Sequence, residues 1–181
     1  MTAKGHMLLA STITFGALTY VKQHYPIYSP SSLVSVVIIL SGIIVGSIFP
    51  DIDEDESYIG NKLKLFSVVI SSLFKHRTFT HYLITPILCL TLTYFFVEPH
   101  SYTQLFFYSF SIGILMHDLG DMLTNGGIRG FFFPLFPNTR IALLPSFLRF
   151  GTFSLTEYVF IGLILFPSNT YLVLNYFNIL Q

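Results

Sequence analysis

The chain has 181 residues, of which 52% are hydrophobic, 17% aromatic and only 10% charged, and its mean hydropathy is +0.68. A soluble domain carries roughly 25% charged residues, so the composition argues against a soluble protein and predicts one membrane-embedded domain over residues 1–181. The formal net charge is zero, which offers no basic surface for nucleic acid. The single cysteine can form neither an internal disulfide nor a cysteine metal site.

Apolar segments predict an all-α polytopic bundle of about five transmembrane helices. The segments cover residues 7–21, 33–49, 82–97, 104–117, 153–166 and 170–180. Most are shorter than the roughly 20 residues that span a bilayer comfortably, so we expect packing within the bundle or local thinning to help them cross. The first segment follows a single basic residue and lacks a cleavage site of small residues, which indicates a retained helix rather than a signal peptide.

One shorter segment has a different character. KLKLFSVVISSLFK, residues 62–75, is too short to cross and has lysines near both ends. This pattern is typical of a helix that lies in the membrane interface. Such a helix leaves the number of crossings unchanged.

Counting crossings brings several polar groups to one face of the membrane. The first two crossings place His6 and the acidic stretch PDIDEDE (50–56) on the same side. The third crossing begins after HRTFTH (76–81), and the fourth returns the chain to that side in HDLGD (117–121). Glu157 begins the fifth helix there. The sequence therefore predicts a polar cluster built from distant helix ends.

Basic residues orient that face toward the cytoplasm. Lys22 alone is expected on the opposite side, and lysine and arginine accumulate in cytoplasmic loops. The basic residues expected beside the polar cluster are Lys4, Lys62, Lys64, Lys75, Arg77, Arg129, Arg140 and Arg149.

HDLGD is the first candidate for chemistry. His117 and Asp121 are four residues apart, so on a continuing helix both side chains point the same way and can hold one cation, whereas Asp118 points elsewhere. A helix end near the interface also carries polar residues without any ion. That simpler interpretation stays open for this pair alone.

The acidic stretch supplies further candidates. Asp51 and Asp53 follow the second apolar segment, where negative charge at a helix C-terminus is mildly unfavourable unless a cation compensates it. We expect these two residues to bind metal and Glu54, Asp55 and Glu56 to face solvent. A solvated acidic loop is the alternative.

HRTFTH adds two histidines and an arginine. His76 and His81 can reach inward as neutral imidazoles, which are common zinc ligands. Arg77 is placed to contact a phosphate or a lipid head group. With His6 and His117, four of the six histidines are expected on the face that carries nearly all the carboxylates.

Glu157 lies about one turn inside the fifth helix, where a charged group usually finds a partner. It is a candidate ligand or base. Pairing with Arg149 or Arg140 is the alternative, and Ser154 or Thr152 is expected to cap the helix.

Histidine nitrogen and carboxylate oxygen without thiolate favour zinc, with manganese or iron as the other hydrolytic choices. The candidate ligands exceed the needs of one ion, so the site can hold one or two. Such a centre lowers the pKa of bound water and stabilises negative charge on a phosphoryl or acyl oxygen, which predicts hydrolysis. A metal that only ties helix ends together is the main alternative. A transporter is disfavoured because the helices are almost bare of polar residues near the midplane.

Four motifs in this order resemble the YdjM-like family of bacterial inner-membrane proteins. They are GH (5–6), PDID (50–53), HRTFTH (76–81) and GILMHDLGDMLTNGGI (113–128), and the resemblance covers about the first 140 residues. Members are described as predicted membrane-bound metal-dependent hydrolases, some of them linked to the LexA-controlled DNA-damage response. The resemblance implies a multi-pass inner-membrane protein with a metal-site set of His6, Asp51, Asp53, His76, His81, His117 and Asp121. Tyr82 departs from the small or serine residue that usually follows HRxxTH in the family.

A more distant similarity is to zinc-dependent phospholipase C enzymes, in the order of His, Asp, His, His-x-x-x-Asp and a late Glu. It implies a ligand role for Glu157 and a phosphodiester substrate. We therefore expect a hydrolase that acts on a phosphoester or a lipid head group in contact with membrane lipids, with Asp53, Glu157 and Arg77 as the candidate catalytic residues. The oligomeric state stays open.

Overall fold

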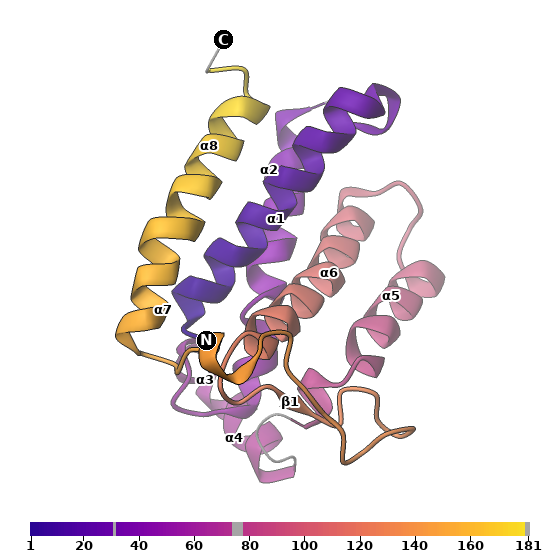
Figure 1. Ribbon diagram of the computed structural model, residues 1–181. Coiled ribbons are helices and arrows are strands. Elements are labelled where there is room, and N and C mark those ends of the chain that lie inside the picture. Colours follow the sequence, from indigo (N-terminus) through magenta and orange to yellow (C-terminus); the bar gives the residue numbers. More distant parts are fainter. Residues whose placement is uncertain (31, 74–77, 180–181) are drawn as a thin grey trace.

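The computed structural model describes residues 1–30, 32–73 and 78–179, and this part of the chain is mostly helical (Figure 1). The α-helices are α1 (Ala3–His24), α2 (Leu33–Gly46), α3 (Tyr58–Lys62), α4 (Lys64–Leu73), α5 (Ile84–Phe96), α6 (Tyr102–Met122), α7 (Leu155–Phe160) and α8 (Phe166–Tyr176). Short 3₁₀-helices are η1 (Pro26–Tyr28), η2 (Phe49–Asp53), η3 (Phe79–His81) and η4 (Ser146–Leu148), and η5 (Ile161–Leu165) is a π-helix. The expected helical fold is confirmed. A small antiparallel pair, β1 (Ile128–Arg129) and β2 (Arg140–Ile141), is an addition to it.

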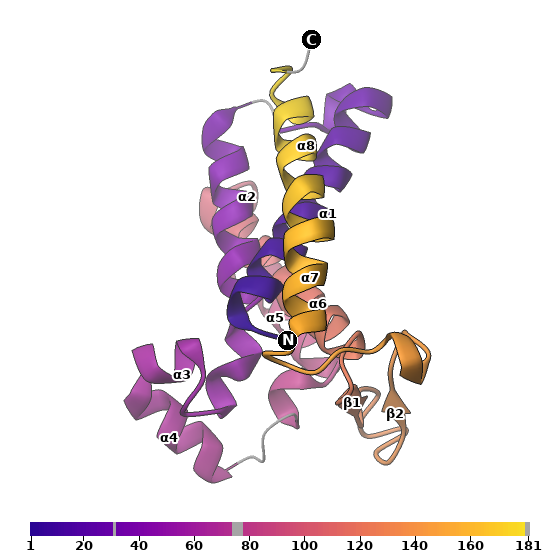
Figure 2. The same cartoon turned by 60° about the vertical axis from the view of Figure 1, so that its left-hand side comes forward.

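The long helices lie side by side, and α3, α4 and the β1–β2 pair gather at one end of the bundle (Figures 1 and 2). That end also holds the N-terminus, the beginning of α7 and the end of α6. Polar segments from distant parts of the sequence therefore meet there, as the crossing count predicts.

Two stretches are long and apolar enough to cross a membrane, Leu33–Asp53 and Leu155–Tyr176. The helices α1 and α6 have comparable lengths of 22 and 21 residues but are less apolar, and α5 is apolar but shorter. Two spans are thus supported by length and composition, and a total of about five crossings stays a prediction.

The last two apolar segments form one continuous helix, not two. The stretch from α7 through η5 to α8 is unbroken around Pro167. Proline lacks an amide hydrogen, and the turn before it widens into the π-helix η5, in which the amide of Phe166 donates to the carbonyl of Ile161. A proline in the first turn of α8 is therefore tolerated without a loop.

The expected interfacial helix lies at the end of the bundle and runs across it (Figure 2). Within the described residues it corresponds to α4, and the separate short helix α3 precedes it and ends at Leu63, whose amide donates to the carbonyl of Ile59. Exposed apolar side chains of α4 include Leu65, Phe66 and Leu73. This arrangement suits a membrane interface.

Close packing of α2 against α6 positions the polar end of both helices. A methyl group on Gly46 would overlap the carbonyl oxygen of Phe110, and one on Gly113 would overlap that of Ile43. Gly42 is equally tight, because an added carbon there would lie 2.5 Å from the carbonyl oxygen of Phe106. Small residues at such positions let helix backbones approach closely.

The variant Gly46→Ala should therefore destabilise the protein by about 1–3 kcal/mol, because the added carbon forces α2 and α6 apart. The midpoint of thermal unfolding in detergent measures this effect. The matched control is Gly16→Ala in α1, where the new carbon would meet its nearest neighbour, Leu172 Cδ1, at an ordinary 3.7 Å. Equal midpoints for the two variants would show that the α2–α6 contact is not tight.

Candidate metal centre

Four segments deliver side chains to the polar end of the bundle. His6 comes from the first turns of α1, Asp51 from η2 beyond α2, His81 from η3, and His117 and Asp121 from the end of α6. All of these except Asp51 are buried, and 21% of the Asp51 side chain is exposed. The predicted convergence of these five residues is therefore present.

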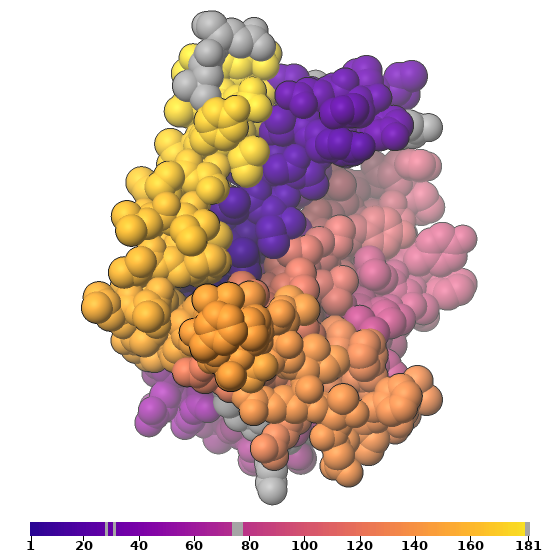
Figure 3. All heavy atoms as spheres, in the orientation of Figure 1, coloured from indigo at the N-terminus to yellow at the C-terminus, as the bar shows by residue number. Residues whose placement is uncertain are grey.

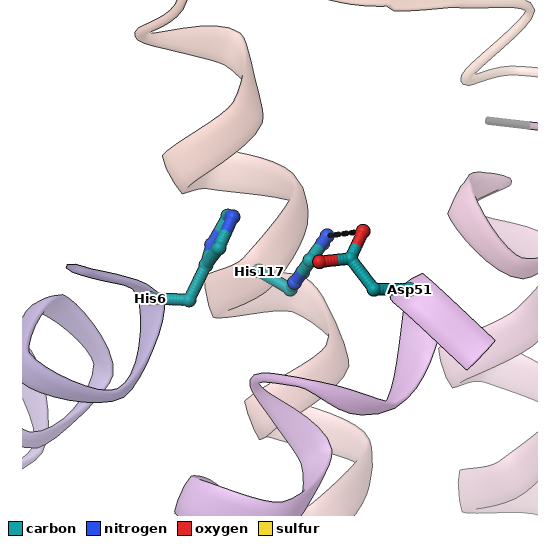
Figure 4. A group of neighbouring side chains, drawn as sticks. All are labelled: His6, Asp51 and His117. Carbon is teal, nitrogen blue, oxygen red and sulfur yellow. Dashed lines mark ion pairs between the residues drawn. The ribbon is translucent and has the colours of Figure 1, made fainter. Parts of the chain in front are cut away.

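The ligand atoms form two overlapping groups that share His117. One group is His6, Asp51 and His117, which Figure 4 shows converging from three elements. The other is His81, His117 and Asp121, and within each group the ligand atoms lie within 4.8 Å of one another. Both groups could hold a metal ion.

The shortest distance in the second group joins the Nε2 atoms of His81 and His117, which are 3.2 Å apart. Asp51 Oδ1 lies 3.6 Å from His117 Nε2 and 4.0 Å from His81 Nε2. Asp121 Oδ2 lies 3.9 and 3.8 Å from the same two nitrogens. Two nitrogens and two oxygens therefore surround one small volume.

Hydrogen bonds on the far side of each ring fix which nitrogen carries the proton. His117 Nδ1 donates to the carbonyl oxygen of Ser47 over 2.8 Å. Thr80 donates its hydroxyl hydrogen to Asp53 Oδ2 over 2.6 Å, so its oxygen accepts from His81 Nδ1, which lies 3.0 Å away. In neutral rings both Nε2 atoms then present lone pairs toward each other.

Two opposed lone pairs repel unless a proton or a metal ion lies between them. At a Zn–N distance of about 2.0–2.1 Å, two nitrogens in tetrahedral coordination lie about 3.3 Å apart. The observed 3.2 Å fits that separation. The donor set of His81, His117 and Asp121 therefore fits a divalent ion, and Asp51 Oδ1 lies within 4.0 Å of both nitrogens.

His6 extends the set. Its ring stacks on His117 with centroids 3.8 Å apart and an interplanar angle of 12°, and its Nε2 lies 3.4 Å from Asp121 Oδ1. Both ring nitrogens are buried, and Nδ1 has no hydrogen-bond partner among the described residues. A buried imidazole in that state is suited to metal coordination. A side chain at Gly120 would collide with this ring, since an added carbon would lie 2.7 Å from His6 Nδ1.

Asp53 lies behind the centre and outside both groups. It accepts from Thr80, and its Oδ2 is 3.7 Å from His81 Nδ1, the ring nitrogen that faces away from the ligand cluster. Such a carboxylate orients a histidine ligand and makes it a better electron donor. The geometry suits a positioning role for Asp53, and its predicted ligand and catalytic roles stay predictions.

The variant Thr80→Val tests this support of His81. Losing the hydroxyl that links His81 to Asp53 should weaken metal affinity by about 10–100-fold. Titration of the metal-free protein with zinc against a fluorescent chelator measures it. Thr91→Val is the control, because the hydroxyl of Thr91 is exposed and bonds only to the Ile87 carbonyl in its own helix. Equal zinc affinities of the Thr80→Val and Thr91→Val variants would show that Thr80 does not support His81 as a ligand.

Glu157 is fully buried, but its carboxylate is bound by backbone amides. Its Oε1 accepts from the amide of Thr2 over 2.5 Å, and its Oε2 accepts from that of Phe153 over 2.7 Å. Ser154 caps the amide of Glu157, as the sequence suggests. Glu157 thus ties the beginning of α7 to the beginning of α1, and it belongs to neither ligand group.

The variant Glu157→Gln should consequently lower the free energy of unfolding by about 1.5–3 kcal/mol, since a charged acceptor of two amides is replaced by a neutral amide. Bound metal per folded protein should stay unchanged. Chemical denaturation followed by circular dichroism, together with elemental mass spectrometry, separates these readouts. Loss of metal without loss of stability would instead make Glu157 a ligand.

Two predicted residues, His76 and Arg77, lie outside the described residues. The sequence did not single out Ser47, and it gave Asp118 no role in the site. Asp118 was expected to point elsewhere, but it is 1% exposed, and its carboxylate oxygens have no hydrogen-bond partner among the described residues. Its burial at the end of α6 follows from contacts that helical spacing alone does not reveal.

A cavity of about 630 Å³ opens beside the centre. Asp51 and Asp121 line it, and the three clustered histidines do not. A ligand in the cavity would therefore meet the carboxylate side of the centre. That volume is in the range of sites that bind small molecules, roughly 300–1,000 Å³.

The helical bundle, its apolar spans and the buried histidine–aspartate cluster define a membrane protein with a candidate metal site. The chain belongs to the family of the YdjM inner membrane protein, whose family model matches residues 1–180. No solved structure matches the chain.

Two relatives show how far the similarity extends. The uncharacterized protein YvsG of Bacillus subtilis (strain 168) is 34% identical over 110 residues, which cover 61% of this chain and 64% of YvsG. The inner membrane protein YdjM of Escherichia coli (strain K12) is 30% identical over 130 residues, which cover 71% of this chain and 63% of that protein. The YdjM of Shigella flexneri matches to the same extent. The match spans just under two thirds of the length of each relative.

Proposed function

We propose that this protein is a multi-pass membrane hydrolase that uses one or two divalent ions, preferably zinc, to cleave a phosphoester or a lipid head group. The observation that carries this proposal is the 3.2 Å approach of the His81 and His117 Nε2 atoms, each ring being held by a hydrogen bond on its other nitrogen. A metal bound there would supply a water of lowered pKa and a positive charge for a phosphoryl oxygen.

The residues of the cluster would have different roles in the reaction. His81, His117 and Asp121 would hold the ion from a buried position, with His6 as a further ligand. Asp51 is the partly exposed member of the set and lines the cavity. Its carboxylate can therefore both contact the ion and accept a proton from water that enters through the cavity.

We further propose that the site faces the cytoplasm from about five crossings. The excess of lysine and arginine at the polar end supports this orientation. Zinc is favoured over manganese and iron because the set combines three imidazoles with carboxylates and offers few oxygen ligands. The lipids of the surrounding membrane would then both surround the protein and supply its phosphoester substrate.

A second candidate function is structural. The ligands come from α1, η2, η3 and α6, so a bound ion would tie four distant segments together. Under this alternative the protein would hold stoichiometric metal and hydrolyse neither phosphodiesters nor phospholipids.

Metal content is the first test. We expect detergent-purified protein to retain one or two equivalents of zinc or manganese by elemental mass spectrometry, and His117→Ala and Asp121→Ala to lose them at equal folded yield. His24→Ala is the matched control, because His24 lies at the far end of α1 and bonds to the Tyr20 carbonyl. Equal metal in all four proteins, or none in any, would contradict the metal centre.

Hydrolysis is then assayed on the metal-loaded proteins with bis(p-nitrophenyl) phosphate and with phospholipids in mixed micelles. The proposed enzyme should lose at least 100-fold in rate upon His117→Ala, because a positioned metal supplies most of the catalysis. A metal-loaded wild type without activity on either substrate would favour the structural alternative.

A further inference from the structure

The cavity beside the metal centre has two chemically different sides. Its charged lining consists of the acidic residues Asp51, Glu54, Glu56 and Asp121 together with Lys4 and the N-terminal residue Met1. Phe153, just before the last helix, and Tyr158 and Ile161 within it add an apolar lining. A ligand that fills the cavity must therefore match a charged site and a hydrocarbon surface at once.

The apolar side belongs to a helix that is long and apolar enough to span a membrane. Tyr158 is in α7 and Ile161 begins η5, within the candidate span Leu155–Tyr176. Leu155 and Leu163 on the same stretch are exposed, with 78% and 73% of their surface accessible. In Figures 1 and 3 this helix lies at the margin of the molecule. The cavity wall is thus continuous with a surface suited to contact lipid.

Phe153 adds a backbone observation at the same place. It has a φ of +61°, a left-handed conformation that a bulky side chain rarely adopts, and its ring is 74% exposed. The amide of Phe153 donates to Glu157 Oε2, which fixes this conformation. Unusual backbone geometry persists where the surroundings impose it, often at ligand sites. Here it holds an exposed aromatic ring at the cavity.

We propose that the cavity binds a single-chain or double-chain lipid phosphate from the side of the bilayer. Its phosphate lies toward Asp51, Asp121 and the ion they hold, with Lys4 as a counter-charge, and its hydrocarbon chain leaves along Phe153, Tyr158 and Ile161. The inference deepens the proposed function, on which it rests for the position of the phosphate. A soluble phosphoester would leave the apolar side of the cavity without a partner.

The π-helix η5 begins where the hydrocarbon chain is proposed to leave the cavity. Ile161 is the first residue of η5, and π-turns frequently occur at functional sites because they shift side chains from their α-helical positions. Gly162 follows it, and an added carbon there would meet no atom within 4 Å. Gly162 therefore adds no side chain next to Ile161.

The absence of tryptophan from the chain allows a direct binding experiment. Tyr158→Trp places a reporter in the cavity wall, and Val159→Trp places a matched control on the next residue, which is exposed but does not line the cavity. The zinc-loaded proteins in lipid nanodiscs are titrated with 12-bromododecyl phosphate, whose bromine quenches tryptophan fluorescence. Phe153→Trp is a second cavity reporter in case Tyr158→Trp folds poorly.

We expect saturable quenching at the cavity reporter and weak, non-saturating quenching at position 159. Unlabelled dodecyl phosphate should reverse the signal at a concentration at least tenfold lower than either inorganic phosphate or dodecanol. Identical, non-saturating curves at both positions would overturn the inference. Displacement by inorganic phosphate as effective as by dodecyl phosphate would overturn it too, because the hydrocarbon wall would then contribute nothing.

Binding and turnover are read separately. If the protein cleaves bis(p-nitrophenyl) phosphate but shows no saturable quenching, the lipid inference is wrong and the hydrolase proposal stands. If quenching saturates as expected but no substrate is cleaved, the lipid site stands and the hydrolase proposal fails.

Discussion

The close approach of α2 and α6 is the constraint on which the polar site depends. Gly46 and Gly113 leave no room for side chains between the two backbones. Because of that contact, the carbonyl of Ser47 at the end of α2 reaches His117 on α6, and Asp51, four residues further on, faces the same ring. A wider separation would take away both the proton acceptor of His117 and one carboxylate. Small residues in the membrane segment thus set the geometry of the centre at its end.

The sequence predicts that His6, Asp51, His117 and Asp121 meet, because the number of helices that cross the bundle fixes the end at which each residue lies. It does not predict which side of a short helix each residue occupies. Asp51 and Asp53 illustrate this limit. In a 3₁₀-helix, residues i and i+2 point in directions about 240° apart around the helix axis. In η2, Asp51 therefore lines the cavity, whereas Asp53 faces Thr80. Alternation within PDID cannot be interpreted without knowing that local conformation.

The sequence around Glu157 predicts a helix N-terminus, but it does not predict what the Glu157 carboxylate binds. A serine followed three residues later by a glutamate is the pattern of a capping box at the beginning of a helix, and Ser154 does accept the amide of Glu157. The partner amides of the carboxylate belong to Thr2 and Phe153, and the first of these is distant in sequence. A long-range backbone contact of this kind leaves no periodic trace, so the structural role becomes evident only from the fold.

Burial of the imidazoles links metal binding to folding. His6 Nδ1 is buried without a hydrogen-bond partner among the described residues, and an unsatisfied buried polar group costs about 1–3 kcal/mol. An ion at the centre offsets part of that cost, so both the catalytic and the structural proposal predict stabilisation by metal. Accessibility separates the two. A purely structural ion would be best enclosed on every side, whereas here the partly exposed carboxylate of Asp51 lines the cavity. The catalytic proposal requires such access to the centre, whereas the structural proposal does not.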